Sequence, residues 1–301
     1  MSTPTDEPTN ETAQWQARFG RAAHMLNDTR QLATLAQMIA QINTLAEPTA
    51  QCVTGGETLV QARRVGLLAG SYNPLTLAHI ALAEAARQTA RLETLVWGMA
   101  VVTVDKERVQ RASLPDRLAQ LIAYLGSQQS AVPSAFPDAL VIFNHGLYVE
   151  QAQALRHLLA PETDLTIIVG FDKIVQILDP RYYADRAAAL GRLFGLARLL
   201  VAPRAGQGAE ALAALLAQPD NQPYAPFISF CPLDPRYTTD SSSEARALAA
   251  KMSPMEIVHS SELRRLLPPE GVALAQAGAY TPVLNNDASD PYARRVAQYT
   301  S

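Results

Sequence analysis

Residues 65–88 read VGLLAGSYNPLTLAHIALAEAARQ, an apolar run followed by a polar loop and then by apolar residues at helical spacing. The loop GSYNPLTLAH, residues 70–79, contains glycine, asparagine and proline, which favour turns. A strand that runs through a short loop into a helix is typical of a βαβ unit. In such units the loop lies beyond the carboxyl end of the strand, where ligands bind. The order of these residues therefore predicts both a parallel sheet and a binding edge.

The same order repeats along the chain. The apolar runs TLVWGMAVVTV, ALVIFN, DLTIIVGF and RLLVAP alternate with segments whose apolar residues recur at helical spacing. Nearly continuous apolar strands suit a sheet that is buried on both faces. We therefore predict an α/β fold, a doubly wound (Rossmann-like) parallel sheet with helices on both faces.

Composition divides the chain into four parts. Residues 1–13 are polar and predict a disordered tail, and residues 14–60 predict a helical N-terminal extension. Residues 61–283 form the main domain, and residues 284–301 form a polar C-terminal tail. With 301 residues and 48% hydrophobic content, the chain can bury a full α/β core.

Charge and cysteine content exclude several classes of protein. The formal net charge of −3 offers no broad basic surface, so we expect no nucleic-acid partner. Cys52 and Cys231 lie far apart in the sequence, which argues against a disulfide framework or a zinc site. The polar N-terminus and the lack of a long apolar run predict a cytoplasmic protein without a membrane partner. The oligomeric state stays open, a homo-oligomer included.

The loop of residues 70–79 has the features of an anion site. Helix N-termini carry unpaired N–H groups and the positive end of the helix dipole, and Gly70 allows the backbone to approach a ligand closely. Thr76 can cap the following helix, and His79, three residues later, shares its face. The alternative is a plain N-cap beside a structural histidine. The loop is neither a Walker A loop nor a GxGxxG motif.

A second candidate anion site is VHSSELRRLL, residues 258–267. Serines favour N-cap positions, and Ser261 and Arg265 are four residues apart, so they share a helix face. A guanidinium on that face could bind phosphate oxygens. The alternative is a capped surface helix with solvated arginines.

Together these motifs resemble the nucleotidyltransferase superfamily. GSYNPLTLAH resembles its [HT]xGH-type signature and is closest to the loop GSFNPxTxxH of nicotinamide mononucleotide adenylyltransferases. HSSELRR is similar to the ISSTxxR signature of that family. Between them, GFDKIVQILDPRYY resembles the GxD segment with its following aromatic residue, and VAPRAG resembles the PRxG loop. The resemblance covers about residues 65–280.

The resemblance implies adenylyl transfer from ATP to nicotinamide or nicotinate mononucleotide, giving NAD or deamido-NAD and pyrophosphate. It also implies that Mg²⁺ arrives with ATP rather than in a protein metal site. Two alternatives stay open. One is a cytidylyltransferase of the same fold. The other is a nucleotide-binding module that has lost catalysis, suggested by Glu262 within the second motif.

The resemblance also implies roles for individual residues. His79, Thr76 and Arg265 would act on the reacting phosphates. Lys106 would bind the mononucleotide phosphate, with Arg117 as a weaker candidate. Tyr182 or Tyr183 would stack near the pyridine ring. The residues expected to bind ATP are Gly70, Ser71, Tyr72, Asn73, Gly170, Asp172, Arg204, Ser260 and Ser261.

Overall fold

The computed structural model describes residues 29–101, 112–131 and 136–280. Lys106 lies outside these ranges, so its predicted role stays a prediction. Within the described residues, no helix is long and apolar enough to cross a bilayer.

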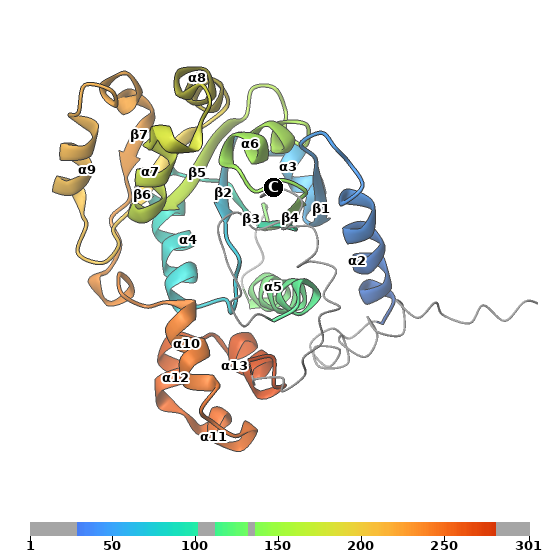
Figure 1. The fold of residues 1–301 in the computed structure, drawn as a ribbon. Helices are drawn as coiled ribbons and strands as arrows, with labels where there is room; N and C mark the ends of the chain where they lie inside the picture. Colours follow the sequence, from blue (N-terminus) through green and yellow to red (C-terminus); the bar gives the residue numbers. More distant parts are fainter. Residues whose placement is uncertain (1–28, 102–111, 132–135, 281–301) are drawn as a thin grey trace, which may run out of the picture.

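One seven-stranded sheet organises the molecule (Figure 1). Its order is β1-β4-β3-β2-β5-β6-β7, and all neighbouring strands are parallel except β1 and β4. The chain moves from β2 to one side of the sheet and later returns to its other side, so the topology switches between β2 and β5. The strands are β1 (Ala50–Thr54), β2 (Arg64–Ala69), β3 (Thr94–Ala100), β4 (Ala139–Phe143), β5 (Asp164–Gly170), β6 (Arg198–Ala202) and β7 (Ile228–Phe230).

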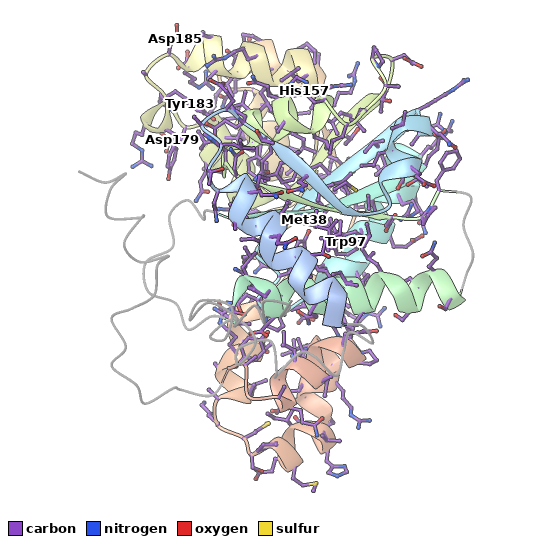
Figure 2. The ribbon with its side chains drawn as sticks, turned by 90° about the vertical axis from the view of Figure 1, so that its right-hand side faces the viewer. Met38, Trp97, His157, Asp179, Tyr183 and Asp185 are labelled. Carbon is purple, nitrogen blue, oxygen red and sulfur yellow. The ribbon has the colours of Figure 1, made fainter. Side chains whose placement is uncertain are left out.

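Helices cover both faces of the sheet, which confirms the predicted doubly wound fold. One face packs against α2 (Thr29–Ile42), α4 (Leu77–Ala90) and α5 (Leu114–Ala131). The other face packs against α3 (Gly56–Gln61), α6 (Tyr148–Arg156), α7 (Phe171–Leu178), α8 (Arg186–Leu196) and α9 (Ala209–Leu216). Figure 2 labels Met38 on α2 and Trp97 on β3; Trp97 is buried in the first of these apolar clusters, and Met38 packs against that cluster.

The C-terminal helices form a third, smaller cluster beside α4 and α5 (Figure 1). They are α10 (Ser242–Ala249), α11 (Pro254–His259), α12 (Ser261–Leu266) and α13 (Pro269–Gln276). Their apolar side chains, such as Leu263 and Leu274, are fully buried against one another. This cluster positions α10 beside the loop that precedes α4, and Ser242 on α10 donates a hydrogen bond to that loop.

The structure corrects one part of the predicted N-terminal extension. Residues 50–54 form the edge strand β1 rather than a helix, and they pair antiparallel with β4. The segment AQCVT is short and lacks a clear apolar pattern. Its strand conformation is therefore set by pairing with β4, which the local sequence does not reveal.

Candidate active site

A cavity of about 610 Å³ opens at the carboxyl ends of the central strands. Gly70 follows β2, Gly170 ends β5 and Pro203 follows β6, and all three line it. Ala100, the last residue of β3, lines it as well. The cavity therefore lies at the topological switch between β2 and β5, where doubly wound sheets bind their ligands.

The loop that joins β2 to α4 is fixed by side chains from two other helices. The carbonyl of Ser71 accepts a hydrogen bond from Arg117 on α5 at 2.7 Å. The carbonyl of Pro74 accepts one from Ser242 on α10 at 2.9 Å, and that of Asn73 accepts one from Arg246. Since α5 and α10 hold the loop from both sides, its backbone is pre-organised at the cavity.

Thr76 and His79 form a capping box at the start of α4. Nδ1 of His79 accepts a hydrogen bond from the Thr76 backbone N–H at 3.1 Å and lies 2.7 Å from Thr76 Oγ1. A ring nitrogen that accepts a backbone N–H carries no hydrogen, so the neutral ring bears its hydrogen on Nε2. Both residues line the cavity. His79 is thus oriented to donate from Nε2.

Tyr72, predicted as an ATP-binding residue, is a core residue whose side chain does not line the cavity. Its side chain is 1% exposed, and its hydroxyl donates to the carbonyl of Leu68. The ring packs 5.2 Å from the His79 ring and 5.6 Å from the Trp97 ring, measured between centroids. A Cβ on Gly70 would lie 3.0 Å from the Tyr72 ring, so glycine lets the loop close over this aromatic support.

The N-terminus of α10 contributes a second set of hydroxyl and cationic groups to the cavity. Ser241, Ser242, Ser243 and Arg246 all line it. Ser241 caps the helix, because its hydroxyl accepts the N–H of Glu244 at 3.1 Å. Arg246 donates to Ser243 Oγ at 3.0 Å and to the loop before α4. Two helix starts that offer hydroxyl and N–H groups, those of α4 and α10, therefore meet at one cavity.

Sequence reasoning missed this segment, although a signal was present. Residues 241–246 read SSSEAR, with hydroxyl side chains at the first three positions and arginine at the sixth. This matches the pattern SSTxxR more fully than residues 260–265, SSELRR, which have glutamate at the third position. The choice between the two copies follows from their places in the fold.

The structure therefore corrects the prediction for Ser260, Ser261 and Arg265, which do not line the cavity. Ser260 caps α12 by accepting the N–H of Leu263 at 3.2 Å, and Ser261 is exposed. α12 packs on α10, α13 and α4 within the C-terminal helical cluster. Arg265 instead donates to Asp240 at 2.9 Å and to Glu244 at 3.1 Å. The hydrogen bond to Asp240 raises the pKa of the Arg265 guanidinium.

Most other predicted residues do line the cavity. Arg204 lines it and donates to the carbonyl of Asp240 at 2.9 Å. Tyr183 donates its hydroxyl to the carbonyl of Ile177 at 2.8 Å, which fixes its ring, whereas Tyr182 is 43% exposed. Figure 2 shows Tyr183 near Asp179. The predicted residues that line the cavity are Gly70, Ser71, Asn73, Thr76, His79, Gly170, Asp172, Tyr182, Tyr183 and Arg204.

The cavity suits an anionic ligand. Its lining includes the cationic side chains of Arg117, Arg204, Arg246 and Lys173, and only Asp172 and Asp240 as carboxylates among the described residues. In the part of the chain that the structure describes, no three metal-ligating side chains cluster together. Cationic and hydroxyl groups at helix starts are the features that bind phosphate.

A doubly wound sheet with two helix starts at one cavity is the arrangement in which many α/β proteins bind nucleotides. The model of the cytidylyltransferase-like family matches residues 67–266, so the chain belongs to this family. The resemblance of its motifs to the nucleotidyltransferase superfamily is thereby confirmed.

Two curated relatives are named as enzymes of the nucleotidyltransferase class. The chain is 30% identical over 166 residues to a probable nicotinate-nucleotide adenylyltransferase of Synechococcus sp. (strain JA-3-3Ab), covering 52% of this chain and 72% of that protein. It is 28% identical over 155 residues to a probable nicotinate-nucleotide adenylyltransferase of Geobacter sp. (strain M21), covering 51% of this chain and 66% of that protein.

Solved structures are similar at lower identity. The nicotinic acid mononucleotide adenylyltransferase of Plasmodium falciparum, complexed with APC, has a TM-score of 0.48 and 13% identity, covering 72% of this chain and 97% of that one. The same protein complexed with NaAD has a TM-score of 0.49 and 14% identity, covering 70% and 94%.

Proposed function

We propose that the protein transfers the adenylyl group of ATP to nicotinate or nicotinamide mononucleotide, giving deamido-NAD or NAD and pyrophosphate. The observation that carries this proposal is the meeting of two helix starts, those of α4 and α10, at one cavity. Thr76 and His79 lie at the start of α4, and Ser241, Ser242 and Arg246 lie at the start of α10. Family membership and the names of the curated relatives support it.

The reaction needs alignment more than acid–base chemistry. A phosphate oxygen of the mononucleotide forms a bond to the α-phosphorus of ATP, and the bond from that phosphorus to the α,β-bridging oxygen breaks. The electron pair leaves with pyrophosphate. Since the attacking phosphate is already ionised, no general base is required. Positioning of the two anions and stabilisation of the developing charge then account for the rate.

The geometry suggests which side chains would contact which phosphate groups. His79, with Nδ1 accepting from the Thr76 N–H, would donate from Nε2 to an oxygen of the reacting phosphate. The serines of α10 and Arg246 would bind the β- and γ-phosphates of ATP, in place of Ser260, Ser261 and Arg265, for which the resemblance implied contacts with ATP. Arg246 also bonds to the loop before α4, so both phosphate sites would move as one unit.

The two nucleosides would lie at the ends of β5 and β6, beside the topological switch. Gly170, Asp172 and Arg204 lie at the ends of β5 and β6, and we assign them to the adenosine. Tyr182 and Tyr183 line the cavity beyond α7, where either ring could cover the pyridine.

Mg²⁺ would enter with ATP. The donor set fits this mode of binding, because the cavity offers hydroxyls and cations and the carboxylate of Asp172 rather than a cluster of metal ligands. Mg²⁺ keeps several waters and is commonly held through phosphate oxygens. When bound, it would neutralise charge on the triphosphate.

Pyrophosphate release is the test of this proposal. The protein is assayed with ATP plus nicotinate mononucleotide, with ATP plus nicotinamide mononucleotide, and with CTP plus a phosphorylated alcohol. We expect turnover with ATP and at least one mononucleotide. Turnover with CTP alone would support the second candidate, a cytidylyltransferase of the same family. ATP binding without turnover would indicate a module that has lost catalysis.

A further inference from the structure

Arg265 joins the two acidic residues that flank the serines of α10. One guanidinium nitrogen of Arg265 donates to Asp240 Oδ1 at 2.9 Å, and the other donates to Glu244 Oε1 at 3.1 Å. Asp240 directly precedes Ser241, and Glu244 directly follows Ser243. One arginine from α12 therefore spans the segment of residues 241–243, here called the serine turn.

The two carboxylates are unfavourable neighbours for a phosphate site. Asp240 lines the cavity and its side chain is only 4% exposed, so solvent screens its charge poorly. Glu244 lies one residue beyond the hydroxyls that face the cavity. Without a counter-charge, both would repel a triphosphate bound at the serine turn. Arg265 provides that counter-charge to both at once.

The same contact also fixes the position of the turn. The backbone carbonyl of Asp240 accepts a hydrogen bond from Arg204, in the loop after β6, at 2.9 Å. Its side chain accepts one from Arg265 on α12, so Asp240 links this loop to α12. The neighbouring Arg264 shares none of these contacts, because it donates to the carbonyl of Val258. The chain thus offers two adjacent arginines with different partners.

We propose that Arg265 is a positioning residue for the triphosphate of a nucleotide substrate, acting by neutralising Asp240 and Glu244 beside the serine turn. This inference rests on the proposed function, because it takes the serine turn as the site of the β- and γ-phosphates. It concerns ATP affinity rather than the chemical step, since Arg265 lies outside the cavity.

The test compares Arg265→Met with Arg264→Met in the full-length protein. ATP affinity is measured by calorimetric titration with a non-hydrolysable ATP analogue, and steady-state assays give KM and kcat. We expect Arg265→Met to weaken ATP binding about tenfold, with KM for the mononucleotide unchanged, because a buried carboxylate loses its partner. Arg264→Met should bind ATP like the wild type. Equal ATP affinities in the two variants would overturn the proposal.

Charge removal separates neutralisation from a purely structural effect. The triple variant Asp240→Asn, Glu244→Gln, Arg265→Met lacks all three charges, and we expect its ATP affinity to return to within about threefold of the wild type. The loss in Arg265→Met should also shrink at high salt, because salt screens the exposed Glu244. A triple variant that binds ATP as weakly as Arg265→Met would contradict neutralisation.

Two further measurements keep the outcomes distinct. If Arg265→Met does not fold, as judged by circular dichroism, Asp240→Asn with Arg265 intact serves instead, and we expect it to bind ATP more tightly than the wild type. Weaker binding would then overturn the proposal. Failure of the proposed function would give a different result. The wild type would bind the ATP analogue and Arg265→Met would bind it more weakly, yet neither protein would turn over a mononucleotide.

Discussion

His79 is fixed in one tautomer by the backbone of its own capping box. On the role proposed for His79, we predict that His79→Ala lowers kcat about 100-fold, because a donor to the reacting phosphate stabilises the transition state rather than the bound substrate. Pyrophosphate release under saturating substrates measures this. His157→Ala is the matched control, since His157 lies at the end of α6 and does not line the cavity. An unchanged kcat in His79→Ala would contradict the role.

The two serine–arginine segments make opposite predictions. Arg246 lines the cavity, so we predict that Arg246→Met raises KM for ATP by about 10- to 100-fold. This range corresponds to the free energy that a hydrogen bond to a charged group usually contributes. Ser261→Ala should leave KM and kcat unchanged, because Ser261 is exposed on α12 away from the cavity. Steady-state kinetics with ATP as the varied substrate checks both variants. If Ser261→Ala were the damaging change, the serine turn would not be the phosphate site.

At this scale, local spacing predicts one half of the site and not the other. Thr76 and His79 are three residues apart on one helix, so their shared face follows from the sequence alone. The serine–arginine pattern occurs twice, at residues 241–246 and 260–265. Only the packing of α10 against the loop before α4 decides between them. The position of Tyr72 was likewise not predictable from spacing, because a residue within a binding motif can be buried beneath the loop instead of facing the ligand.

Among the elements, the strand β3 depends on a glycine for its packing. A Cβ on Gly98 would lie 2.7 Å from Leu67 Cδ1 and 2.9 Å from the Phe143 ring. We predict that Gly98→Ala lowers the free energy of unfolding by about 1–3 kcal/mol, since overpacking displaces both neighbours. Urea denaturation measures the change.

Gly126 in α5 provides the control for that substitution. No atom lies within 4 Å of a Cβ built there, and the residue is inside a helix. Gly126→Ala should therefore leave the stability unchanged or raise it by about 0.5–1 kcal/mol, because alanine is the better helix former. A loss in both variants would mean that the packing of Gly98 is not the cause.

The elements themselves were predictable wherever the pattern was periodic. The buried strands β2 to β6 are apolar and alternate with helices, so their order follows from the sequence. β1 was missed because AQCVT has no such pattern and its conformation depends on β4, which lies about ninety residues later. An edge strand of this kind is decided by tertiary pairing rather than by its own residues.

At the scale of the whole molecule, the topology explains why distant motifs act together. The switch between β2 and β5 opens the cavity, and the C-terminal helices then carry the serine turn to the loop before α4. The sequence predicts the doubly wound sheet and its binding edge but not the return of α10, because that return depends on the burial of α10 to α13 against one another.

The two cysteines make the stability of the folded protein depend on pH. Cys231 is fully buried, and burial raises its pKa to about 11; burial likewise raises the pKa of Cys52 to about 11. The unfolded chain releases these protons near pH 9, whereas the folded protein retains them. The stability that this difference contributes is full below pH 9 and is lost as the pH rises through 11.

We predict that the free energy of unfolding falls between pH 9 and 11, with Cys231 contributing about 1 kcal/mol of the loss by pH 10. Urea denaturation at a series of pH values measures the slope. The variant Cys52→Ala, Cys231→Ala should show a shallower slope over the same range, whatever constant cost its smaller side chains add. Burial of Tyr124 also raises its pKa, to about 12, in both proteins, so the difference between the slopes isolates the thiols. Identical slopes would show that the thiols ionise as readily in the folded protein as in the unfolded chain.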